Sequence, residues 1–303
     1  MNRLILYSML LLSAFSFLTC KITDRKPVEV PTGFDWQGHR GCRGLFPENS
    51  LPGFLHALEY PGVQTLELDL AVSKDRQLIV SHEPWFNPAI CRDSQGNMIE
   101  AKDEKKHLIF EKTAEEIKTY DCGSWGNTRF PDQTLVKTHK PTLREVVEAV
   151  GRLYPEKRIR WNLEIKSNPE WDGKFSPTIS EFVALVQKEI SALQLSDRVC
   201  VQSFDPRPLQ LLHQQAPGLT LALLVENTDG FEKNLERLGF KPSIYSPYYW
   251  LVSSDLVEKC KKKGVKLIPW TVNEVTAMRR LVRLGVDGII TDYPNLIEQV
   301  GKK

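Results

Sequence analysis

Apolar and polar residues alternate with a period of two over the run Thr65–Leu70. This period predicts a β-strand and places Glu67 and Asp69 on one face, about 7 Å apart along the strand. A polar turn and the apolar run 78–80 then lead to His82. We expect a β-hairpin whose register brings His82 opposite Asp69 or close to it. By themselves, these acids fit a solvated surface hairpin equally well.

Strand and helix patterns alternate along the rest of the chain. Besides the hairpin strand, the pattern predicts eight strands, near 34–41, 65–70, 158–166, 199–203, 219–224, 243–246, 265–270 and 286–290. Helices are expected near 54–58, 143–150, 178–193, 206–216, 230–239, 253–263 and 274–284. Eight strands joined through helices within about 265 residues predict an α/β fold, a TIM (β/α)8 barrel over residues 33–303. Residues from about 83 to 140 are irregular and rich in Pro and Gly, as in an insertion that forms a lid or binding loop.

The amino terminus has a different composition. The positive start Met1–Arg3 precedes an almost wholly apolar run, 4–18, which is too short for a comfortable membrane span and typical of a signal peptide, residues 1–20. The run ends at Cys20, as in bacterial lipoprotein signals, whose cysteine becomes lipidated. The pattern favours an exported lipoprotein, anchored to the membrane through Cys20, over a freely periplasmic protein or a retained anchor. Residues 21–32 are expected to form a tether.

Charge and cysteine content narrow the possible partners. A formal net charge of +2 gives no sign of nucleic-acid binding, and no protein partner is predicted. Five cysteines follow Cys20, an odd number that cannot all pair within the chain. Cys91 and Cys122 share the insertion and are the best candidates for a disulfide, although the sequence leaves their pairing open. Cys200 lies in an apolar run and is expected to be a buried free thiol.

Polar clusters fall at the carboxyl ends of the predicted strands. In a TIM barrel these ends meet on the face that holds the active site. Glu67 and Asp69 from one strand and Glu164 from the next form an oxygen-only ligand set. Such a set is typical of one hard divalent cation, and Mg²⁺ and Ca²⁺ fit it equally well.

Two histidines and two cations accompany these carboxylates. His39 and His82 stand at strand ends, so one imidazole can take a proton from an attacking oxygen while the other gives one to a leaving alkoxide. Arg40 offers a forked donor for phosphate oxygens and Lys166 a point charge. Trp270, also at a strand end, is expected to line the substrate pocket. Together with a cation, this set suits the hydrolysis of a phosphodiester.

Nine short motifs carry a family resemblance, which runs in order from about Trp36 to Pro294. They are His39-Arg40-Gly41, Pro47-Glu48-Asn49-Ser50, Glu67-Leu68-Asp69, His82, Pro141-Thr142-Leu143, Glu164-Ile165-Lys166, Ser203-Phe204, Trp270-Thr271-Val272-Asn273 and Thr291-Asp292-Tyr293-Pro294. By these motifs the chain resembles the glycerophosphodiester phosphodiesterases. The resemblance implies a TIM barrel with an insertion after the second strand. It also implies that a glycerophosphodiester, such as glycerophosphocholine or glycerophosphoethanolamine, is split into sn-glycerol 3-phosphate and an alcohol.

The resemblance further implies a role for each polar residue. The metal ligands would be Glu67, Asp69 and Glu164, the acid/base pair His39 and His82, and the phosphate contacts Arg40 and Lys166. Glu83 stands where the family usually has Asp, and Cys42 and Arg43 stand where small residues are common. We expect these three positions to lie beside the chemistry and to tune it.

Two other functions compete with this one. A related barrel phospholipase or lyase would form a cyclic phosphate, which would make the glycerol hydroxyl rather than water the attacking group. The near-neutral charge argues mildly against this reading. A non-catalytic surface lipoprotein would bind a phosphate ligand without turnover, but the complete set of competent residues argues against it.

Overall fold

The computed structural model describes residues 27–302. The predicted signal peptide, Cys20 and residues 21–26 of the tether therefore lie outside the described residues. Within the described range, no helix has the length and hydropathy that crossing a membrane requires. The first described residues run beside the last helix, where the backbone N–H of Val28 donates to the carbonyl of Val300.

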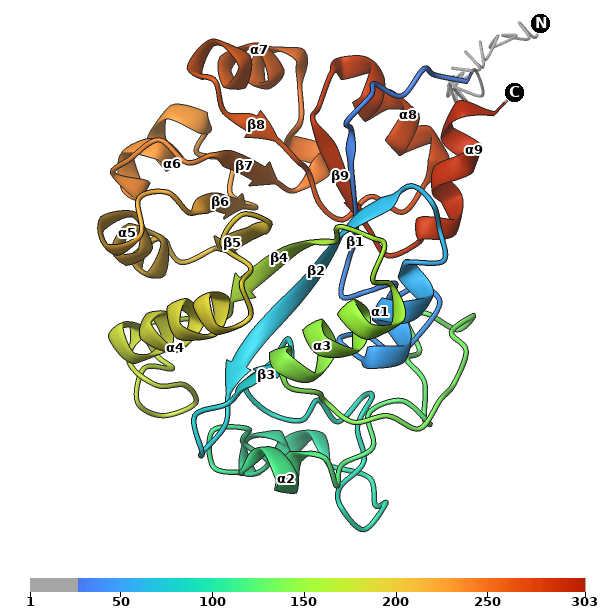
Figure 1. Cartoon of the computed structure of the whole chain (residues 1–303), viewed down its shortest axis with the longest axis vertical. Helices are drawn as coiled ribbons and strands as arrows, with labels where there is room; N and C mark the ends of the chain where they lie inside the picture. Colours follow the sequence, from blue (N-terminus) through green and yellow to red (C-terminus); the bar gives the residue numbers. More distant parts are fainter. Residues whose placement is uncertain (1–26, 303) are drawn as a thin grey trace, which may run out of the picture.

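Eight parallel strands form a nearly closed barrel, which confirms the predicted TIM fold (Figure 1). Their order around the barrel is β8-β7-β6-β5-β4-β2-β1-β9. Between β8 and β9, the N–H of Ile290 donates to the carbonyl of Pro269 and the N–H of Val272 to the carbonyl of Ile290. The strands are β1 (Asp35–Gly38), β2 (Val63–Val72), β4 (Arg160–Ile165), β5 (Val199–Ser203), β6 (Thr220–Val225), β7 (Ile244–Pro247), β8 (Lys266–Leu267) and β9 (Gly288–Thr291).

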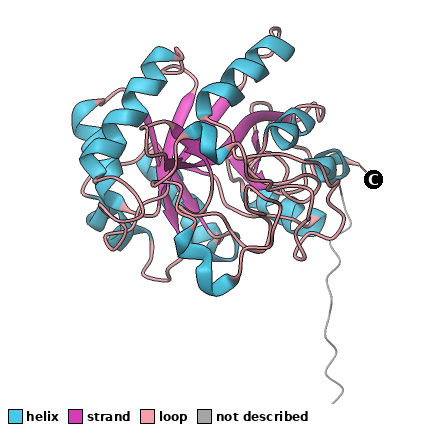
Figure 2. Ribbon diagram, turned by 90° about the horizontal axis from the view of Figure 1, so that it is seen from below, coloured by secondary structure: helices cyan, strands magenta, loops and turns pink. Residues whose placement is uncertain are grey.

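Helices surround the strands (Figure 2) and bury their apolar faces against them. In α3, for example, the periodic residues Leu143, Val146, Val147 and Val150 are all buried, and a capping box at Thr142 starts the helix. The helices are α1 (Leu51–Ala57), α3 (Leu143–Leu153), α4 (Ile179–Ala192), α5 (Pro206–Gln215), α6 (Phe231–Leu238), α7 (Ser254–Lys263), α8 (Val275–Leu284) and α9 (Ile297–Gly301), with short 3-10 turns η2 (Tyr249–Leu251) and η3 (Pro294–Leu296).

The strand predicted over 265–270 is shorter in the structure. β8 spans only Lys266 and Leu267, because Pro269 has no N–H for a ladder hydrogen bond. The chain nevertheless stays beside β7, since the N–H of Trp270 donates to the carbonyl of Pro247. Trp270 therefore still reaches the carboxyl end of the barrel.

The insertion is irregular, as predicted, but it has a core of its own. β3 (Leu78–Val80) pairs antiparallel with β2 and leads into it. The insertion contains the 3-10 turn η1 (Ala101–Lys106) and the capped turn α2 (Ala114–Ile117). Cys91 and Cys122 form a disulfide inside a second cluster of buried residues, separate from the barrel core.

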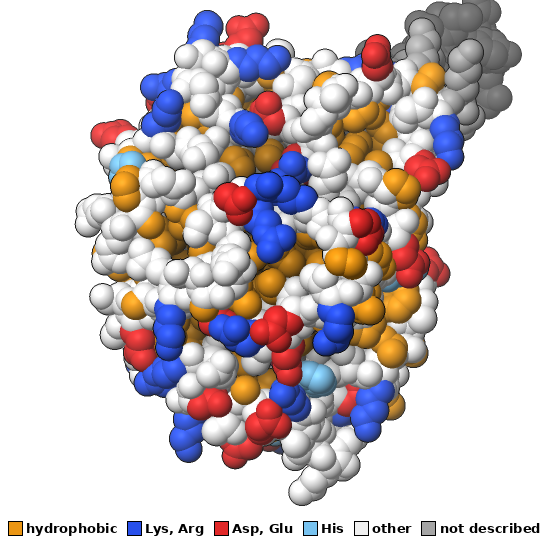
Figure 3. Space-filling model, in the orientation of Figure 1, with side chains coloured by type: hydrophobic (Ala, Val, Ile, Leu, Met, Phe, Trp, Pro, Cys, Tyr) orange, Lys and Arg blue, Asp and Glu red, His pale blue; other side chains and the backbone are white. Residues whose placement is uncertain are grey.

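Cys200 is free, as predicted, but only half-buried. It points into a cavity at the amino-terminal end of the barrel rather than into the packed layer beneath the helices. On the outer surface, charged side chains of both signs are interspersed over the face seen in Figure 3, in keeping with the near-neutral net charge of +2.

Candidate active site

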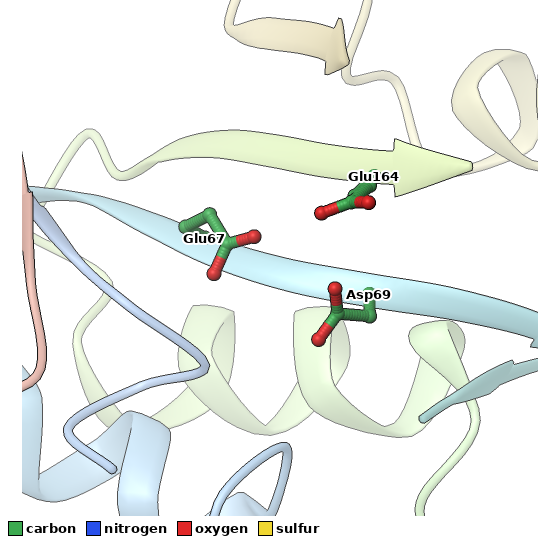
Figure 4. Close-up of side chains that lie close together, drawn as sticks. All are labelled: Glu67, Asp69 and Glu164. Carbon is green, nitrogen blue, oxygen red and sulfur yellow. The ribbon is translucent and has the colours of Figure 1, made fainter. Parts of the chain in front are cut away.

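Three buried carboxylates converge at the carboxyl ends of β2 and β4 (Figure 4). The parallel register pairs Asp69 with Glu164, so that alternate residues of both strands point into the barrel. One oxygen atom from each of Glu67, Asp69 and Glu164 lies within 4.8 Å of the other two. Oδ1 of Asp69 is buried and has no hydrogen-bond partner in the described part of the chain. An unsatisfied acceptor in an oxygen-only cluster fits a hard divalent cation.

Burial and mutual repulsion shift the pKa values of these three carboxyl groups. Burial, together with the charges of Asp69 and Glu164, raises the pKa of Glu67 well above its ordinary value. Burial also raises the pKa of Glu164. For Asp69 burial acts in the same direction, but Arg40 and Lys166 outweigh it and hold the pKa well below its ordinary value. A nearby divalent cation would favour the ionised form of all three acids.

Two cationic side chains lie against the carboxylates. Nε of Arg40 is 3.1 Å from Oδ2 of Asp69, and Nζ of Lys166 donates to Oε1 of Glu164 at 2.8 Å. Arg40 has a φ of 50°, in the left-handed region that non-glycine residues rarely adopt. This conformation directs its backbone N–H to Oε2 of Glu67 at 2.8 Å. Such strain is often found at functional sites.

His39, which follows β1, has its two ring nitrogens in different surroundings. Nδ1 lies 2.6 Å from Oδ1 of Asp292, and Nε2 lies 3.9 Å from Oε2 of Glu67. Burial lowers the pKa of His39 to about 4, and Arg43 adds to the effect. The pKa of Asp292 lies well below its ordinary value, because His39 and Arg43 outweigh its burial. An ionised carboxylate only accepts hydrogen bonds, so Nδ1 carries the proton and Nε2 keeps its lone pair.

Asp292 also belongs to the site, although the sequence analysis did not assign it a role. It lies 253 positions from His39, and its only signal is its place in a motif after the last strand. Asn273 donates to its Oδ2 at 2.7 Å, and Arg43 donates to both of its oxygens at 2.9 and 3.1 Å. Arg43 thus contacts the carboxylate that holds His39, a position beside the proposed chemistry from which its charge can tune the histidine. Cys42 does lie apart, with its thiol donating to a backbone carbonyl.

His82 reaches the same site from the end of the hairpin. Ser81, not His82, lies opposite Asp69, and His82 follows one residue further on. Nδ1 of His82 lies 2.9 Å from Oε1 of Glu83. Burial acts to raise the pKa of Glu83, but His82 and Lys140 outweigh it and lower the pKa to about 2. Glu83 is thus a direct partner of His82, and each histidine has one carboxylate at Nδ1.

A cavity of about 570 Å³ brings the predicted residues together at the carboxyl face of the barrel. Asp69 is fully buried and does not line it, and the insertion adds Arg129 and Phe130 to its wall. The other predicted residues line it directly: His39, Arg40, Glu67, His82, Glu164, Lys166 and Trp270.

An aromatic cluster forms part of the cavity wall. The ring of Trp270 lies 5.3 Å from that of Phe204 and 5.6 Å from that of Tyr248, measured between centroids. Nε1 of Trp270 donates to the carbonyl of Ser246 at 2.8 Å, which fixes the orientation of the indole. Glu226 follows β6, between the strands that carry Phe204 and Tyr248, and lines the same cavity. The cavity therefore has a polar part, lined by the histidines, cations and clustered carboxylates, and an aromatic part that also contains Glu226.

Comparisons with known proteins agree with this geometry. The model of the glycerophosphoryl diester phosphodiesterase family matches residues 39–296. The chain is 33% identical over 267 residues to a glycerophosphodiester phosphodiesterase of Caldanaerobacter subterraneus, covering 88% of this chain and 96% of that protein. A crystal structure of a provisionally assigned glycerophosphoryl diester phosphodiesterase from Silicibacter pomeroyi superposes with a TM-score of 0.79 at 30% identity, covering 91% of this chain and 95% of that one.

A more distant structure shows the same fold. The Oleispira antarctica phosphodiesterase in complex with the product sn-glycerol-3-phosphate has a TM-score of 0.69 at 21% identity, covering 89% of this chain and 96% of that one. The match of one family model to most of the barrel, with a relative of 33% identity over nearly its full length, decides the assignment. The chain belongs to the glycerophosphoryl diester phosphodiesterase family and is a phosphoric diester hydrolase.

Proposed function

We propose that this enzyme hydrolyses glycerophosphodiesters to sn-glycerol 3-phosphate and an alcohol, using one divalent cation and two histidines. The observation that carries the proposal is the convergence of three buried carboxylates with His39 and His82 in one cavity. In each histidine, a carboxylate at Nδ1 leaves Nε2 available for the reaction. The sn-glycerol-3-phosphate complex of the Oleispira antarctica relative supports the choice of product.

Glu67, Asp69 and Glu164 would hold the cation, either Mg²⁺ or Ca²⁺. A bound cation neutralises phosphate charge and orients the diester for in-line displacement. In the structure, Lys166 and Arg40 lie against these same carboxylates. Both cationic side chains line the cavity, where they can turn to the phosphate oxygens.

The two histidines divide the proton transfers. His39, with its lowered pKa of about 4, is neutral at pH 7 and accepts the proton of the attacking oxygen at Nε2. His82, paired with the ionised Glu83, donates a proton to the leaving alkoxide. Water as the attacking group gives the two linear products directly, whereas attack by the glycerol hydroxyl gives a cyclic phosphate first.

The aromatic cluster suggests which alcohol is released. Trp270, Phe204 and Tyr248 would receive the head group, and the carboxylate of Glu226 would attract a positive charge on it. Aromatic faces with a nearby carboxylate favour ammonium groups. Glycerophosphocholine and glycerophosphoethanolamine are therefore the first substrates to test.

We further propose that the enzyme works outside the cytoplasm, anchored through a lipid on Cys20. The disulfide between Cys91 and Cys122 supports export, since disulfides persist in oxidising compartments. The anchoring is tested by expressing the full chain and Cys20→Ser in a bacterial host. Membrane association and lipid labelling that persist in the variant would refute it.

The reaction is tested with residues 21–303 and the two substrates, first in EDTA and then with added Mg²⁺ or Ca²⁺. Release of glycerol 3-phosphate is followed by a coupled assay, and phosphorus NMR detects a cyclic product. Turnover only with metal, lost in Glu67→Ala, is expected. A cyclic phosphate as the final product would identify a lyase instead.

A further inference from the structure

Three buried amide side chains cross the interior of the barrel and end on a carboxylate of the active site. They belong to Gln37 on β1, Asn162 on β4 and Gln202 on β5. Nδ2 of Asn162 donates to Oε1 of Gln37 at 2.8 Å and to Oε1 of Gln202 at 3.0 Å. Nε2 of Gln202 then donates to Oε1 of Glu67 at 3.0 Å, and Nε2 of Gln37 donates to Oδ2 of Asp35 at 2.9 Å.

The orientation of each amide in this hydrogen-bonded series follows from the two acids at its ends. When Asp35 and Glu67 are ionised, as Glu67 would be beside a cation, they only accept hydrogen bonds, so the neighbouring glutamines point their NH₂ groups outward, toward those acids. Both glutamine carbonyls then face inward, and the central amide has to donate twice. Asn162 meets this requirement with its two N–H bonds, and no other orientation of the three amides satisfies both ends.

Asn162 bears a cost for this arrangement. Its Oδ1 is buried and has no hydrogen-bond partner among the described residues. An unsatisfied buried acceptor costs on the order of 1–3 kcal/mol, and an apolar side chain would avoid that cost. The hydrolysis proposed above assigns no step to any of the three amides, so their arrangement calls for another explanation.

The end of this series of amides at Asp35 is fixed as well. Oδ1 of Asp35 accepts hydrogen bonds from Thr65 at 2.6 Å and from Arg160 at 2.7 Å. Nε of Arg160 also donates to the hydroxyl of Thr65 at 3.0 Å. Asp35 therefore cannot turn to offer a different oxygen without breaking this group, and it sets the direction of Gln37.

We propose that Gln202, Asn162 and Gln37 form a positioning chain for Glu67. Gln202 donates to Oε1 of Glu67, while the backbone N–H of Arg40 donates to Oε2 at 2.8 Å. Two donors, one on each oxygen, fix the plane of the carboxylate, and each oxygen keeps lone-pair capacity for a cation. This inference rests on the proposed metal role of Glu67.

The positioning role of the three amides is tested through metal affinity, measured by isothermal titration calorimetry with Ca²⁺ and Mg²⁺ in the absence of substrate. Gln202→Met keeps the length and volume of the side chain but removes the donor. It is expected to weaken metal binding by about 10–100-fold, the usual effect of losing a partner that orients a ligand. Gln37→Met, which touches neither Glu67 nor the cavity, is expected to weaken binding less, by several-fold.

Gln210→Met is the matched control. This glutamine also donates through its side chain, but to carbonyls at the end of α6, away from the site. Unchanged affinity in Gln202→Met and Gln37→Met, with folding verified by circular dichroism, overturns the inference. If Gln202→Met does not fold, Gln37→Met decides alone. A wild-type protein that binds neither metal refutes the metal role of Glu67 itself, which is a different result.

Discussion

Replacing Asp292 with Asn tests the role of the residue that sequence reasoning missed. The change keeps the shape of the side chain but removes the charge that accepts the Nδ1 proton of His39 at 2.6 Å. An amide NH₂ can donate to Nδ1, which would move the imidazole proton to Nε2. Nε2 would then no longer hold the lone pair needed to accept a proton from the attacking oxygen.

The expected magnitude follows from the step that is lost. A positioned acid or base contributes about 10²–10⁴-fold to a rate, which corresponds to about 2.7–5.4 kcal/mol of activation free energy. We therefore expect kcat for glycerophosphocholine to fall by about 10²–10⁴-fold. Metal affinity is expected to stay near the wild-type value, because the carboxylate of Asp292 bonds to His39, Arg43 and Asn273 rather than to the three clustered acids.

The assay combines steady-state kinetics with calorimetric measurement of the metal Kd on the same preparation. Asp255→Asn is the control, since this exposed acid forms an ion pair with Lys259 on the surface of α7, away from the cavity. A kcat within about threefold of wild type, in a folded and metal-binding Asp292→Asn protein, would show that Asp292 does not set the proton position of His39.

Three further outcomes are expected. In Arg43→Gln, the loss of a nearby positive charge makes protonation of His39 easier, so the acid limb of kcat/KM should move from near pH 4 to higher pH; an unmoved limb contradicts the charge argument. Replacing both Cys91 and Cys122 with Ser should lower the free energy of unfolding by about 3–4 kcal/mol, for a loop of 31 residues, as measured by denaturant titration; an unchanged midpoint would mean that the insertion core suffices alone. Glu226→Gln should lower kcat/KM for glycerophosphocholine by about two- to fivefold relative to glycerophosphoglycerol, whose head group is uncharged. An equal loss on both substrates would exclude recognition of the ammonium group.

The sequence was sufficient to predict the barrel because its strands and helices each carry a local signal. The alternation around Glu67 and Asp69 is visible within six residues, and parallel pairing then brings Glu164 beside Asp69. The insertion could be recognised by its loss of periodicity. The sequence singled out Cys91 and Cys122 as the best candidates for a disulfide but left their pairing open, and it did not reveal the internal core, because both depend on contacts between segments far apart in the chain.

The partners of the histidines were harder to predict for the same reason. Asp292 follows the last strand, and only closure of the barrel brings it beside His39 on the first. Arg43 looked like a small change in a loop, but its side chain is long enough to reach Asp292. Glu83 adjoins His82 in sequence, yet nothing local shows that its carboxylate turns back to the ring.

The pairing of Arg40 and Lys166 with the site carboxylates bears on whether folding or metal binding comes first. Many small metallo-domains stay unfolded until their ion arrives, because metal binding supplies the free energy of folding. A cluster of carboxylates without an ion also suffers mutual repulsion. Here two resident cations counter that repulsion within the polypeptide itself. The chain can therefore reach its native state without an ion, and the proposed cation would bind afterwards, so that metal supply would limit activity rather than folding.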